Sequence, residues 1–167
     1  MLSPKIYIAK AQKGTNGKFI VDESVEIQDY FRGACYKKAD GIENYGKIRL
    51  YTEKFPESPT PDVFFPDNLT REETEFTLTL YFFDLDKHEE ESEAIKAVDE
   101  AYHSFVDYIS GSYIKYWDNV RQRKAMLAYE ESTKPTVDML YGIIYKEVSF
   151  KFKNIYGKSF SLNSTEF

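Results

Sequence analysis

Apolar and polar residues alternate along several parts of the chain, as they do in a β-strand that has one buried face. The clearest example is the segment 74–83, which is rich in the aromatic and β-branched residues that favour strands. Its apolar positions all fall on one face: Phe76, Leu78, Leu80 and Phe82. Shorter segments with extended character are 5–10, 19–21, 46–53, 113–117, 123–130 and 139–153, the last with Gly142 as a bulge. Residues 13–17 predict the turn of an N-terminal hairpin.

After the segment 74–83, the spacing of apolar residues changes to that of a helix. Residues on one side of the helical wheel recur at helical spacing: Ile95, Val98, Tyr102, Phe105 and Ile109. Asp86 and Glu89 could form a capping pair before them, and Gly111 suits the position that ends a helix. The pattern therefore predicts one long helix over about 90–110, with one face packed against a sheet.

These elements predict an α+β fold: an antiparallel β-sheet or β-sandwich with one long α-helix packed on it. The length of 167 residues suits a single domain over 1–167 and is enough to bury a core. The pattern of residues 24–45 is ambiguous, and the polar residues after about 158 are expected to form a loose tail. Aromatic residues make up 17% of the chain, more than one sheet face needs, so we expect some of them at interfaces.

A proline-rich segment over about 55–70 interrupts the strand pattern. It holds four of the six prolines, and proline cannot donate the backbone hydrogen bond that a central strand needs. The segment is nevertheless apolar around Phe64 and Phe65. Two interpretations remain open: a loop that folds back on its own domain, or an arm that docks on a neighbouring subunit.

The net charge is −6, and one segment accounts for all of it. Residues 84–100 contain eight acidic and two basic side chains, whereas the rest of the chain has 20 of each. An acidic balance argues against a general nucleic-acid-binding protein. The acidic segment leads into the predicted helix, where the helix dipole favours carboxylates. It could also provide charge matching between copies in an assembly.

Residues that could carry out chemistry are few. His103 has Asp99 and Asp107 at helical spacing, but this trio faces away from the apolar side of the helix and is expected on the surface. Residues 84–88 resemble the start of a calcium-binding loop, yet later required positions do not match. The single Cys35 excludes internal disulfides and four-cysteine zinc sites. We therefore expect no catalytic residue, no metal site and no cofactor, and a protein that is not an enzyme.

The segment 113–121 mixes aromatic and basic side chains, which are frequent in protein interfaces. Alternation places Tyr113 and Trp117 on one face of the predicted strand, and Arg121 follows. The simplest interpretation is a strand with one core face, but the same rings could contact a protein, a nucleic acid or a carbohydrate. The candidate subunit-interface residues are Phe64, Phe65, Tyr113, Trp117 and Arg121.

The order of strand, acidic connection, helix, glycine, strand and hairpin resembles the tube-forming and connector (neck) proteins of tailed-bacteriophage tails. The resemblance covers about the C-terminal half of the chain, and it is carried by residues 75–82, by the helix up to Gly111 and by residues 148–154. It implies a β-sandwich-like fold flanked by a helix, assembly into rings, loops that reach adjacent rings, and no enzymatic activity.

The resulting hypothesis is a structural virion protein that forms homo-oligomeric rings in a phage tail or head–tail connector. Its partners would be itself and other virion proteins, with assembly in the host cytoplasm and no sequence-specific nucleic-acid partner, although DNA could pass through the lumen of a ring. We expect no membrane contact, because no apolar run approaches the roughly 18 residues of a membrane span and no signal peptide is predicted. The alternative is a ligand-binding α+β module that holds glycans on exposed aromatic residues.

Overall fold

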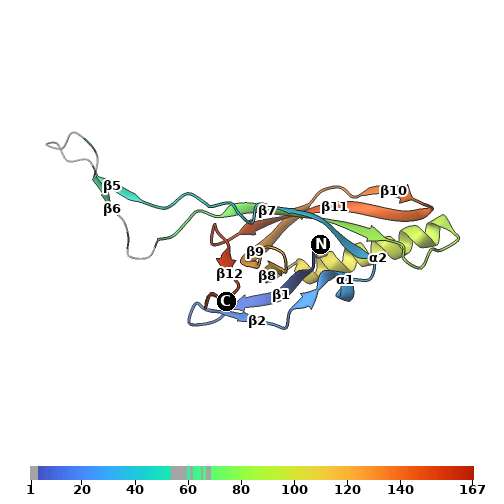
Figure 1. Cartoon of the computed structure of the whole chain (residues 1–167), viewed down its shortest axis with the longest axis horizontal. Coiled ribbons are helices and arrows are strands. Elements are labelled where there is room, and N and C mark those ends of the chain that lie inside the picture. Colours follow the sequence, from blue (N-terminus) through green and yellow to red (C-terminus); the bar gives the residue numbers. More distant parts are fainter. Residues whose placement is uncertain (1–3, 54–59, 61, 65, 67–68) are drawn as a thin grey trace.

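The computed structural model describes residues 4–53, 60, 62–64, 66 and 69–167. Most of its regular elements are β-strands (Figure 1). In chain order the elements are β1 (Ile6–Lys13), β2 (Phe19–Val21), β3 (Val25–Glu26), α1 (Ile27–Tyr30), β4 (Ala34–Asp40), β5 (Tyr51–Glu53), β6 (Asp62–Phe64), β7 (Thr74–Phe83), α2 (Glu91–Ile109), β8 (Tyr113–Asp118), β9 (Arg123–Ser132), β10 (Thr136–Leu140), β11 (Ile143–Asn154) and β12 (Phe160–Ser161).

The main sheet is antiparallel, and α2 lies along one of its faces (Figure 1). The hydrogen-bonded order is β2-β1-β8-β9-β11-β7-β4, with β3 beside β1, β10 beside β11 and β12 beside β9. β7 and β8 are not neighbours in this order, yet the rings of Phe76 and Tyr116 lie only 4.7 Å apart. The sheet is therefore strongly curved around its core. The predicted α+β class is confirmed.

The strand predicted over 74–83 is β7, with the same bounds. Its four inward-facing apolar residues are all fully buried: Phe76, Leu78, Leu80 and Phe82. β7 is a central strand, because β11 pairs with one of its edges and β4 with the other. The predicted N-terminal hairpin is also confirmed, since β1 and β2 pair antiparallel from Ala11 opposite Val21 to Lys13 opposite Phe19.

The predicted long helix is α2, and its apolar side faces the sheet. Phe105 is completely buried, and its ring centroid lies 4.7 Å from that of Phe150 on β11. Ile95 and Tyr102, which the helical wheel also places inward, are only half-buried. The hydroxyl groups of Tyr102 and Ser132 are 3.0 Å apart, so the polar end of this tyrosine has a hydrogen-bond partner.

The two ends of α2 differ in how well the sequence predicts them. The predicted capping pair of Asp86 and Glu89 is wrong, because Glu90 is the N-cap residue and it makes no side-chain capping hydrogen bond. Asp86 instead forms an ion pair with Arg32. At the other end, Gly111 follows the helix with a φ of +80°, as the pattern predicts.

The chain reverses direction within residues 139–153, where the sequence predicts one strand. Tyr141 and Gly142 form a two-residue turn between β10 and β11, which pair along the whole of β10. Both residues have positive φ, 50° and 77°, as a type I′ hairpin turn requires. Gly142 is therefore a turn residue and the prediction of a bulge there is wrong. The irregularity of β11 lies between Lys151 and Phe152.

The segment after residue 158 is packed on the sheet, so the prediction of a loose tail is wrong. It contributes β12, which pairs with β9. The rings of Tyr156, Phe160 and Phe167 lie 5.4 to 5.7 Å from one another. The buried ammonium group of Lys124 donates hydrogen bonds to backbone carbonyls of this segment. The prediction rested on polarity, but these contacts use backbone oxygens and a few widely spaced rings.

The proline-rich arm predicted over 55–70 lies largely outside the described residues, and so does Phe65. Its described part belongs to a two-stranded ribbon in which β5 pairs with β6. Figure 1 shows this ribbon projecting far from the main sheet. Of the extended segment predicted over 46–53, only β5 is a regular strand, and Ile48 makes an isolated bridge with Arg71.

The projecting ribbon is anchored where it leaves the main sheet. The Gly46 amide donates a hydrogen bond of 2.7 Å to the Gly157 carbonyl, and the Glu72 amide donates one of 2.8 Å to the Lys47 carbonyl. The Arg71 guanidinium also donates to the Gly46 carbonyl at 3.0 Å. A Cβ atom at position 46 would clash with the Glu72 carbonyl oxygen, so the two strands can approach this closely only at a glycine. The ribbon therefore begins at a firmly bonded base.

Candidate subunit interface

Tyr113 and Trp117 lie on one face of β8, as predicted, and each ring packs against another ring of the same chain. The Trp117 and Tyr7 rings are stacked almost in parallel, with centroids 4.0 Å apart. Tyr113 meets Phe19 edge to face at 5.0 Å. Both side chains are half-buried. Each ring is therefore partly covered by its own chain before any partner arrives.

Arg121 lies in the turn between β8 and β9, and its side chain is exposed. The Asp118 carboxylate accepts the backbone N–H groups of Val120 at 3.0 Å and of Arg121 at 2.7 Å, which holds the turn in place. The Arg121 guanidinium lies 3.7 Å from the Glu43 carboxylate, a few residues before the base of the ribbon. Because this ion pair is exposed, it contributes little to stability and leaves Arg121 accessible.

Phe64 is part of β6, where its backbone pairs with that of Tyr51, and Phe65 lies outside the described residues. The other three candidates lie on or just after β8. Figure 1 shows β6 far from β8, so the structure does not gather the candidates into one patch. They fall instead at two places: the projecting ribbon, and the surface of β8 with its following turn.

Exposed apolar side chains occur on the described residues of the ribbon and of its shaft, the two chain segments 47–50 and 69–71 that carry the ribbon. Leu50 and Val63 are exposed, and so is Leu69 on the returning strand. Single exposed apolar residues are ordinary, but a projecting ribbon can bury its side chains only against another surface. The described part of the ribbon is therefore the best-supported contact surface among those that the sequence predicts.

A second apolar cluster, which the sequence analysis misses, lies at the tip of the β10–β11 hairpin. Every residue of β10 is exposed. We name as the hairpin tip the four exposed apolar residues of this strand and its turn: Val137, Met139, Leu140 and Tyr141. The turn lacks the Asn-Gly or Asp-Gly dipeptide that usually marks such hairpins, so the sequence pattern alone does not reveal it.

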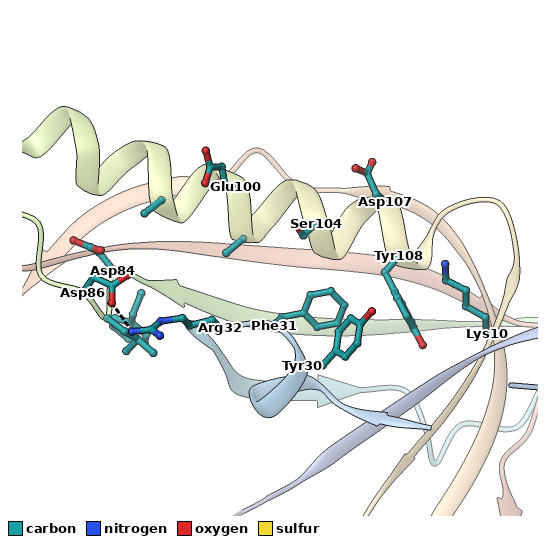
Figure 2. A pocket seen from close by; sticks show the side chains of 14 residues that line it. Lys10, Tyr30, Phe31, Arg32, Asp84, Asp86, Glu100, Ser104, Asp107 and Tyr108 are labelled. Carbon is teal, nitrogen blue, oxygen red and sulfur yellow. Dashed lines mark hydrogen bonds and ion pairs between the residues drawn. The ribbon is translucent and has the colours of Figure 1, made fainter. Parts of the chain in front are cut away.

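A groove of about 720 Å³ runs between α2 and the chain around α1, and Figure 2 shows its lining. The Arg32 guanidinium is paired with Asp86, and the Lys10 ammonium lies 4.7 Å from the centre of the Tyr108 ring. The carboxylates of Glu100 and Asp107 point away from Arg32 in Figure 2. The described residues that line the groove include no histidine or cysteine. Its charged groups therefore do not converge on a point where a substrate could react.

The closest pairing of a histidine with an acid is between His88 and Asp84, in the connection from β7 to α2. The Asp84 carboxylate is only 3% exposed, and it accepts hydrogen bonds of 2.8 Å from the His88 backbone N–H and from the His88 Nδ1. Burial alone would raise the pKa of Asp84, but the hydrogen bonds from His88 lower its pKa overall. The hydrogen bond to Asp84 raises the pKa of His88. The pair therefore stabilises the connection between β7 and α2.

The Asp84–His88 pair should give the stability a characteristic pH dependence. Its contribution is lost as the pH falls through the lowered Asp84 pKa, and lost as the pH rises through the raised His88 pKa. It is therefore fullest between the ordinary values of 3.8 and 6.5. We expect His88→Gln to lower the free energy of unfolding most in this window and less at pH 9. Urea unfolding across pH 4–9 measures the difference, and a loss that stays constant over this range would contradict the assignment.

Cys35 and the trio of His103, Asp99 and Asp107 are the other described groups that the sequence singles out for chemistry. Cys35 is half-buried, and burial raises the pKa of its thiol, which disfavours the reactive thiolate. In the predicted surface trio, His103 and Asp107 are exposed, while Asp99 forms an ion pair with Lys146 on β11. Within the described part of the chain, no three His, Cys, Asp or Glu side chains are grouped as metal ligands.

Among known proteins, no protein-family model matches the chain, and no similar curated protein is found. Among the described helices, none combines the length and the hydropathy needed to cross a bilayer.

Proposed function

We propose that this chain is a non-enzymatic structural protein that self-assembles into rings in a phage tail or a head–tail connector. The observation that carries the proposal is the ribbon of β5 and β6, which projects from a well-packed body (Figure 1) and has exposed apolar side chains at Val63 and, in the chain that carries it, at Leu50 and Leu69. A monomer gains nothing from such a ribbon, whereas a neighbouring copy can cover it. The curved sheet with its packed helix fits the sandwich-like body that the resemblance implies.

Two features favour an arm that docks on a neighbouring subunit: the hydrogen-bonded base of the ribbon and the prolines of the arm. The bonds of Gly46 and Glu72 hold the start of the ribbon in one direction. The four prolines of residues 55–70 limit the backbone freedom of the free arm, so less entropy is lost when the arm becomes ordered on a partner. Both features favour an arm that is aimed at a neighbouring subunit.

The chemistry of the described side chains supports a role without catalysis. The groove beside α2 holds ion-paired or ring-bound cations, and the buried Asp84 is engaged with His88. The sheet face opposite α2 carries lysines matched with glutamates, such as Lys37 with Glu147. A nucleic-acid surface would need unmatched positive charge, so this face favours a structural role over specific DNA binding.

The glycan-binding alternative receives less support from the same surface. A sugar stacks on an aromatic face that is open to solvent, whereas Trp117 is stacked on Tyr7 and Tyr113 packs against Phe19. These contacts favour a stabilising role for the β8 aromatics, with their exposed edges available to a protein partner.

Replacing Phe64 and Phe65 together with serine should weaken self-association without unfolding the subunit. If the arm docks on a neighbour through these rings, the double variant loses its apolar anchors, and we expect the apparent dissociation constant of the assembly to rise at least about tenfold. Sedimentation velocity over a range of protein concentrations measures this change. The circular-dichroism spectrum and the melting of the monomer should remain nearly unchanged.

Ile20→Ser is the matched control for this double variant, because Ile20 is an exposed apolar residue on β2, away from the ribbon. It should assemble like the unmodified protein. If the double variant instead unfolds as a monomer, the two rings belong to the core of their own domain and the arm does not dock through them.

A further inference from the structure

The hairpin tip is an apolar surface held on a rigid support. Met139 is 57% exposed and Tyr141 is 95% exposed, the latter at the outermost point of the β10–β11 turn. β10 pairs with β11 along its whole length, and the Asp84 amide donates a hydrogen bond of 3.0 Å to the Ile144 carbonyl just beyond the turn. These bonds hold the backbone that carries the exposed side chains, so a partner would not have to order the hairpin itself.

Tyr141 occupies a backbone conformation that aromatic residues rarely adopt. Its φ of +50° lies in the left-handed region, where Asn and Gly are favoured and a bulky side chain is strained. A nearly fully exposed tyrosine at such a position contributes little to the stability of its own subunit. Its ring is what an interaction surface would use, because tyrosine is frequent among the residues that dominate binding.

An acidic segment lies at the same end of the molecule as this tip. Figure 1 shows the β10–β11 turn and the beginning of α2 at the same end of the molecule. The acids at the start of α2 are exposed, and within the described part of the chain they have no ion-pair partner: Glu89, Glu90, Glu91 and Glu93. This end of the molecule therefore presents exposed apolar side chains together with unpaired carboxylates, and a fitting partner presents apolar side chains together with bases.

The shaft of the projecting ribbon combines exposed apolar side chains with exposed bases. Lys47 and Arg49 are exposed, and Leu50 and Leu69 beside them are exposed as well. Figure 1 shows the ribbon at one end of the long axis and the hairpin tip at the opposite end. One subunit therefore cannot bring its own ribbon to its own tip, but two copies arranged end to end can.

We propose that the hairpin tip, together with the acidic start of α2, is a docking surface for the ribbon shaft of a second copy of this chain. This inference rests on the proposed function and names the receiving surface for the arm. The two contacting surfaces differ, so each copy can dock its shaft on one neighbour while its hairpin tip binds the shaft of another. The contact therefore propagates around a ring or along a stack. Opposite charges would select the register, and apolar burial would supply most of the affinity.

A first test uses Met139→Ser with Tyr141→Asn. Asn tolerates the left-handed backbone, so the double variant should keep or slightly raise the melting temperature of the subunit. We expect its self-association, measured by sedimentation velocity, to weaken at least about tenfold. Ile20→Ser again serves as the control for loss of an exposed apolar residue. Unchanged assembly of the double variant would overturn the proposal.

A second test reverses the charges. Glu89→Lys with Glu91→Lys, or Lys47→Glu with Arg49→Glu, should each weaken assembly at low salt, because like charges then meet at the contact. The variant that carries all four changes should assemble again, since its tip is then basic and its shaft acidic. A quadruple variant that assembles no better than either pair would overturn the proposal.

The two proposals can fail separately. If the unmodified protein stays monomeric at every concentration, the assembly proposal fails and the docking surface fails with it. If the unmodified protein assembles but the tip and charge variants assemble equally well, only the docking surface is wrong and the arm has another receiving site.

Discussion

Replacing Phe105 with alanine should lower the free energy of unfolding by about 3–5 kcal/mol. Phe105 is fully buried, and its ring lies 5.1 Å from that of Phe31 and 4.7 Å from that of Phe150, with Phe82 completing the cluster. Phe82 and Phe150 come from the sheet strands β7 and β11, and Phe31 follows α1. Truncation would leave a cavity that they cannot fill without breaking strand pairing, so the cost should lie in the upper range for core substitutions.

Urea unfolding followed by circular dichroism measures this loss. Ser104→Ala is the matched control, because Ser104 is exposed on the same helix and its replacement should change stability by no more than about 0.5 kcal/mol. A loss of less than about 1 kcal/mol for Phe105→Ala would mean that α2 does not pack on the sheet through this side chain.

Replacing Lys124 with methionine should release the segment after residue 158 and lower the free energy of unfolding by about 1–3 kcal/mol. The Lys124 side chain is 3% exposed, and its ammonium donates hydrogen bonds to the Ser164 carbonyl at 2.8 Å and to the Glu166 carbonyl. Methionine keeps the length and apolar stem of lysine but removes the donors. The two carbonyls would then recover partners only by turning to water, which detaches the segment.

Hydrogen exchange of residues 160–167 is the direct readout of this release, and we expect it to accelerate in Lys124→Met while β7 stays protected. Lys153→Met is the control, because Lys153 forms only a half-exposed ion pair with Glu73 and its loss should have a small effect. Unchanged exchange in the segment would show that β12 and the aromatic contacts hold it without Lys124.

The sequence predicts the elements in which a single periodicity extends over many residues. β7 has the predicted bounds, because its apolar residues recur at every second position from Phe76 to Phe82 and form one fully buried face. α2 is predicted within one or two residues, because its apolar stripe continues from Ala94 to Ile109 and Gly111 follows. In these elements the burial of one face decides both the secondary structure and its bounds.

The sequence does not predict features that depend on backbone contacts between distant residues. The turn at Tyr141 and Gly142 breaks an apolar run without the usual turn residues, and strand pairing imposes the left-handed conformation on the tyrosine. The anchored base of the ribbon depends on a carbonyl of Glu72 that leaves room only for Gly46. The packed segment after residue 158 depends on one buried lysine and backbone oxygens.

In the candidate interface, too, the sequence predicts what depends on local alternation and not what depends on contacts between distant residues. Composition identifies aromatic residues suited to contacts, and alternation correctly places Tyr113 and Trp117 on one strand face. It cannot show that each of these rings is already packed against a ring from β1 or β2, since those partners are about 100 residues away in the chain. For the same reason the hairpin tip, whose exposure depends on the geometry of a turn, is visible only in the structure.

Self-assembly is tested most directly by the molar mass of the unmodified protein in solution. Light scattering on a size-exclusion column, run at rising protein concentration, gives this mass without any label or partner. The ring proposal predicts one discrete species at a fixed multiple of the 19.6 kDa subunit. A mass of 19.6 kDa at every concentration and at low salt would contradict it.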